Sequence, residues 1–162
     1  MGDIISTDSR FSEAEKRALA LLADMMIPAS GAMPSAADAA IFPRTLAGLS
    51  ANADVVTEAL ATFAELAATQ HQQTLDALGA TQLDELVEQL KRLRPNFIQV
   101  LQAGVISSYY QDDRVLLELG MPARSPHPGG YEVAATDWSL LDPVRKREPF
   151  YRQVGSQGGN NV

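Results

Sequence analysis

Apolar residues recur at helical spacing through the first 120 residues of the chain, and no segment alternates as a strand would. The clearest case is a stripe of leucine and valine at intervals of three or four, the pattern of an amphipathic helix: Leu83, Leu86, Val87, Leu90 and Leu93. Ser12 and Glu15 have the spacing of a capping box, which marks a helix start. The sequence therefore predicts an all-α fold, a bundle of about five to six helices over residues 12–120.

Prolines, glycines and capping residues suggest where each helix begins and ends. Gly79 is expected to end the longest helix, Asp112 to cap the last short one and Gly120 to close it, while Pro43 bends or restarts the second. The expected helices are one from Ser12 to Pro28, a short one from Ser35 through Ala40, a long one from Ala53 to about Ala77, one from Thr81 to Pro95, one over Asn96–Tyr110 and a short one over Val115–Leu119.

The helical pattern stops at Gly120, although the chain continues for another 42 residues. A compact domain rarely carries an irregular segment longer than about 12–15 residues unless that segment binds something or is disordered. Disordered segments are poor in aromatic residues, yet six of the ten aromatic residues lie between positions 109 and 151. We therefore expect residues 121–162 to form an extended arm that wraps a partner and has a disordered end, and residues 1–11 to be a flexible N-terminal segment.

The aromatic residues and the glycine turn of this region are the predicted partner-binding residues. Aromatic side chains that enter pockets dominate binding energy at interfaces, and a Gly-Gly turn allows close approach of the backbone. The alternative is that the rings fold back onto the helical bundle. The predicted partner-binding residues are Tyr109, Tyr110, Pro128, Gly129, Gly130, Tyr131, Trp138, Phe150 and Tyr151.

Charge and composition restrict the kind of partner. The net charge of −7 argues against nucleic acid, which would require a basic face, and the one basic run, 145–147, is flanked by acids and reads as a solvated or partner-contacting turn. No apolar run approaches the ~18 residues of a membrane span, and the absence of cysteine excludes disulfides and thiolate chemistry. The N-terminus lacks the pattern of an export signal. We expect a cytoplasmic chain as written, or a periplasmic one if it is a processed form or is exported with its partner.

The polar residues do not form a convincing catalytic set, so no catalytic, cofactor-binding or metal-binding residue is predicted. His71 lies in a polar helical patch and reads as a surface histidine, and His127 lies in a proline and glycine turn. Asp112 and Asp113 are better explained as capping residues at a helix start than as a pair of catalytic carboxylates. The acids of residues 84–88 lie opposite the leucine stripe, with Lys91 and Arg92 positioned for ion pairs on a solvated face.

Two segments resemble the gluconate 2-dehydrogenase subunit 3 family. The first is Leu19–Pro28 (LALLADMMIP) followed by Pro34–Ala39 (PSAADA), which is similar to the family's helix ending in Asp-x-x-Ile-Pro, a small-residue loop and a second short helix. The second runs from Tyr109 to Tyr131 and is similar to the family's Tyr-rich helix end, short helix and Gly-Tyr turn. The resemblance covers residues 12–131.

The resemblance implies a non-catalytic small subunit that contains no cofactor. In this family the large partner is a glucose–methanol–choline-type oxidoreductase that binds FAD and oxidises a sugar, sugar acid or alcohol, and electrons commonly pass to a cytochrome subunit. The small subunit is thought to support the folding, stability or export of the large one. Many members carry a twin-arginine signal, which the first eleven residues here lack, so export is the expectation that the resemblance supports least.

Two other readings stay open from the residues alone. One is a stand-alone small enzyme that uses His127 with Asp137 or Tyr131, which requires these side chains to converge in a pocket. The other is a helical binding or chaperone-like protein without an enzyme partner. Recovery of a yellow flavoprotein with the chain would separate the small-subunit reading from both.

Overall fold

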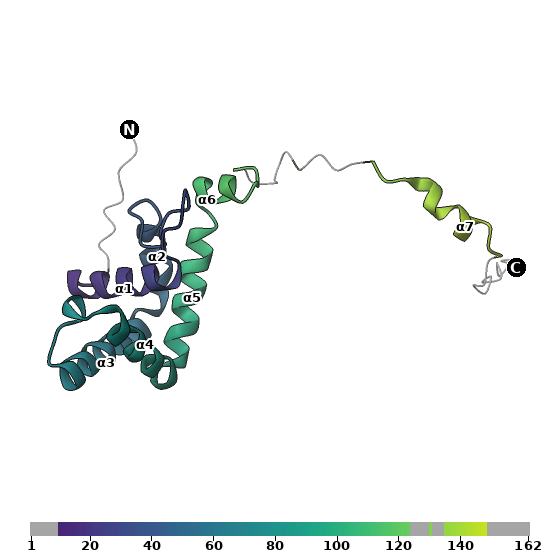
Figure 1. The fold of residues 1–162 in the computed structure, drawn as a ribbon. Helices are drawn as coiled ribbons and strands as arrows, with labels where there is room; N and C mark the ends of the chain where they lie inside the picture. Colours follow the sequence, from purple (N-terminus) through teal and green to yellow (C-terminus); the bar gives the residue numbers. More distant parts are fainter. Residues whose placement is uncertain (1–9, 124–129, 131–134, 149–162) are drawn as a thin grey trace, which may run out of the picture. The chain divides into compact units, whose positions relative to one another are not determined.

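The computed structural model describes residues 10–123, 130 and 135–148, and the chain divides into two units, residues 1–124 and residues 125–162. The described residues form helices and no strand, which confirms the predicted all-α fold. Over residues 10–123 the first unit contains six α-helices (Figure 1), namely α1 (Glu13–Met26), α2 (Phe42–Leu49), α3 (Ala53–His71), α4 (Ala80–Leu93), α5 (Pro95–Tyr109) and α6 (Asp113–Glu118).

Helix α1 begins and ends as its sequence predicts. The backbone N–H of Glu15 donates to Ser12 Oγ at 3.3 Å, and the backbone N–H of Ser12 donates to Glu15 Oε2 at 2.7 Å. Both halves of the capping box are therefore present, and two of the N–H groups left free at a helix start are satisfied. The helix stops at Met26, two residues before Pro28, because a residue that precedes proline is disfavoured in the helical conformation.

The prediction of a short helix from Ser35 through Ala40 is wrong, since this segment forms turns. Ser35 Oγ accepts from the backbone N–H of Ala37 at 3.0 Å, and Asp38 Oδ1 accepts from that of Ala40 at 2.9 Å. Such bonds from short polar side chains compete with helical hydrogen bonding. The helix starts only at Phe42, with Pro43 in its first turn, where a missing N–H costs nothing.

The long helix was also predicted to continue too far. Helix α3 ends at His71, because Gln72 takes the left-handed conformation with φ of 54°, and a separate 3₁₀ turn follows at Leu75–Ala77. Gly79 does not end α3 but forms the N-cap of α4, where its N–H donates to Gln82 Oε1 at 3.0 Å.

Helix α5 is the element against which α2, α3 and α4 pack, and α3 also contacts α1 and α4. Helix α5 runs along one side of the unit (Figure 1). Gly104 allows α2 to approach it closely, because a Cβ added there would meet Leu49 Cδ2 at 3.1 Å. The core confirms most of the leucine stripe of α4: Leu83, Leu86 and Leu90 are buried, but Leu93 at the end of the helix is 57% exposed.

The described part of the second unit contains two short helical segments within the arm that was predicted to be irregular. Trp138–Leu141 forms a 3₁₀ turn, η3, that continues into the short helix α7 (Asp142–Arg145). Asp137 caps the segment by accepting from the backbone N–H of Ser139 at 3.0 Å. Pro143 lies in the first turn of α7, where proline favours a helix start and does not interrupt it. Among the helices that the structure describes, none is long and apolar enough to cross a membrane.

Candidate partner-binding surface

Four of the nine predicted partner-binding residues lie in the described part of the chain, namely Tyr109, Tyr110, Gly130 and Trp138. Gly130 has a φ of 64°, a left-handed conformation that favours glycine and fits the expected turn. The other five lie outside the described residues: Pro128, Gly129, Tyr131, Phe150 and Tyr151.

Tyr109 is a core residue, which corrects its prediction as a partner-binding side chain. Its side chain is 1% exposed, so it has no free surface to offer, and its hydroxyl donates to the carbonyl oxygen of Pro34 at 2.9 Å. Burial raises the pKa of this hydroxyl, which therefore keeps its proton for the hydrogen bond. The residue fixes the turn at Pro34 to the end of α5.

Tyr110, by contrast, is 49% exposed and is available for contact. Its ring stands edge-on to that of Tyr109, with centroids 5.5 Å apart and planes at 88°. This T-shaped arrangement is a favourable one for aromatic pairs. The inner ring thus holds the outer one in position at the surface.

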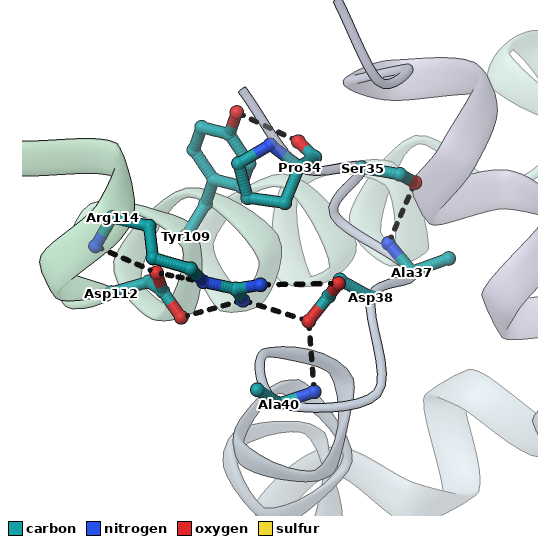
Figure 2. Close-up of polar contacts among 8 residues, drawn as sticks. All are labelled: Pro34, Ser35, Ala37, Asp38, Ala40, Tyr109, Asp112 and Arg114. Atoms are coloured by element: carbon teal, nitrogen blue, oxygen red, sulfur yellow. Dashed lines mark hydrogen bonds and ion pairs between the residues drawn. The ribbon is translucent and has the colours of Figure 1, made fainter. Parts of the chain in front are cut away.

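Arg114 joins the start of α6 to the turn before α2, as Figure 2 shows. Its Nη2 lies 2.8 Å from Asp38 Oδ1 and 3.0 Å from Asp112 Oδ2, and its Nε lies 2.9 Å from Asp112 Oδ1. Asp112 also accepts from the backbone N–H of Arg114 at 3.0 Å, which confirms its predicted capping role. The side chains of this triad, Asp38, Asp112 and Arg114, are partly exposed, so water weakens the electrostatic attraction among them.

We expect the triad to make the protein sensitive to acid. Hydrogen bonds from Arg114 are the main cause that lowers the pKa of both Asp38 and Asp112. A carboxyl whose pKa in the folded state lies below the unfolded value of about 3.9 contributes stability that is complete above that pH and is lost as pH falls through the folded pKa. Arg114→Met should therefore be less stable than wild type at neutral pH, and the difference should shrink below about pH 4.

Urea unfolding of both proteins from neutral pH to the acid limit measures this dependence. Arg44→Met is the matched control, because Arg44 is an exposed arginine without an ion-pair partner in the described part of the chain. A difference between wild type and Arg114→Met that stays constant with pH would contradict the role given to the two carboxyls.

The contacts of this region join the two segments that were singled out in the sequence. Tyr109 binds Pro34, which is 75 residues away, and Arg114 binds Asp38 across 76 residues. The hydroxyl of Ser35 in turn donates to Asp24 near the end of α1. The end of α1, the turns before α2 and the start of α6 therefore form one connected corner of the helical unit.

Several large apolar side chains are exposed in the stretch of sequence from the end of α5 through α6 to the residues just after it. Gly120 closes α6 in the left-handed conformation, with φ of 72°, as predicted. The large exposed hydrophobic residues of this stretch are Ile106, Tyr110, Leu117, Leu119 and Met121.

A second set of exposed apolar residues lies in η3 and α7 of the other unit. Trp138 is 62% exposed, and the exposed residues Leu141 and Val144 follow it at intervals of three. Asp142 and Arg145 are also three residues apart, and Arg145 Nη1 lies 3.5 Å from Asp142 Oδ1. Residues three apart lie on one side of a 3₁₀ turn and close together on an α-helix. The segment 138–145 is thus amphipathic, with its apolar side chains exposed.

The other polar residues that were weighed as functional candidates take part in hydrogen bonds, ion pairs or helix caps where the structure describes them. His71 is half-buried, not a surface residue, and its Nδ1 lies 3.3 Å from Gln82 Nε2. Lys91 Nζ lies 2.6 Å from Glu88 Oε1, as predicted for the solvated face of α4. Asp137 serves as the cap of η3, while His127 and Tyr131 lie outside the described residues. Within the described ranges, no group of three or more histidine or acidic residues is placed to hold a metal ion.

Two features of the surface were missed in the sequence. The Asp38–Arg114 ion pair has no local signal, although the spacing Asp112-x-Arg114 could have indicated that the cap and the arginine meet. A groove between α2 and α5 was also missed, because its walls come from segments about 50 residues apart. Comparisons of the chain with models of known families, with curated proteins and with solved structures found no match.

Proposed function

We propose that this chain is the non-catalytic small subunit of a flavin-dependent dehydrogenase or oxidase that oxidises a sugar, sugar acid or alcohol. In this proposal FAD is bound by a glucose–methanol–choline-type large subunit, with a cytochrome as a further electron-accepting partner. The small subunit supports the folding, stability or localisation of the large one. The identity of the partner rests on the family resemblance of residues 12–131.

The observation that carries the binding role is the exposed amphipathic segment 138–145. Trp138, Leu141 and Val144 together offer an aromatic and two aliphatic side chains at helical spacing. Short amphipathic helices of this kind bind by laying their apolar side in a hydrophobic groove of a partner. Exposed apolar groups that are rimmed by charges are typical of interaction sites.

Co-expression with an FAD-binding glucose–methanol–choline-type oxidoreductase from the same organism, which the proposal expects to be encoded in a neighbouring gene, tests the proposal. Affinity capture of the tagged small subunit should recover a larger flavoprotein with bound flavin and with sugar or alcohol dehydrogenase activity. The chain purified alone should show no flavin absorbance. Capture of a partner without flavin would contradict the proposal and favour the chaperone-like reading, and stoichiometric flavin in the isolated chain would overturn the assignment of FAD to the partner.

A further inference from the structure

We draw no further inference here: the strongest candidate, the apolar hollow of about 440 Å³ between α1, α3 and the 3₁₀ turn Leu75–Ala77, is walled largely by alanines, and nothing in the structure shows what covers it.

Discussion

Tyr109→Ala is expected to lower the free energy of unfolding by about 3–5 kcal/mol, the range found when a large aromatic side chain is removed from a core. Tyr109 is among the largest fully buried side chains of the described chain, and it also donates to the Pro34 carbonyl oxygen. The variant therefore loses packing and leaves a buried acceptor without its partner. Urea unfolding followed by circular dichroism measures the loss.

Tyr110→Ala is the matched control, because it removes the same side chain from the neighbouring position, where the ring is 49% exposed. It should cost about 1 kcal/mol, the size of the edge-to-face contact. Tyr109→Phe should also cost about 1 kcal/mol, because it removes only the hydrogen bond. Equal losses for the two alanine variants would contradict the assignment of Tyr109 to the core.

The two tyrosines show what the sequence could and could not predict. Phe97, Leu101 and Val105 repeat at intervals of four, and the next step of that interval is Tyr109. The spacing therefore contained the information that Tyr109 continues the buried face and Tyr110 does not. The prediction treated them alike because it gave more weight to their aromatic character than to their position on the helix.

Local chemistry predicted the start of α1 and the ends of α6, since capping and left-handed glycine depend on a few adjacent residues. The end of α3 was missed because Gln72, not a glycine, takes the left-handed conformation there. The Asp38–Arg114 pair and the α2–α5 groove depend on how distant segments pack, and no local pattern encodes that packing.

Trp138→Ala is expected to weaken association with the proposed large subunit by about 2 kcal/mol, or roughly 30-fold in Kd, which is typical of an aromatic anchor. Trp138 begins the exposed amphipathic segment and is its largest apolar side chain. A tryptophan ring buried in a partner pocket contributes much of its binding energy by leaving water. Titration of the purified large subunit with each form of the small subunit measures the Kd.

Leu93→Ala is the control, because Leu93 is exposed to a similar extent, 57% against 62%, but lies on α4. Its Kd should match that of wild type. The melting temperature of the free Trp138→Ala subunit should also match, since an exposed ring contributes little to folding. Activity of the complex should fall only through dissociation, so saturating small subunit should restore it. A lower melting temperature of the free variant would mean that the ring packs on its own chain, and an unchanged Kd would rule out Trp138 as an anchor.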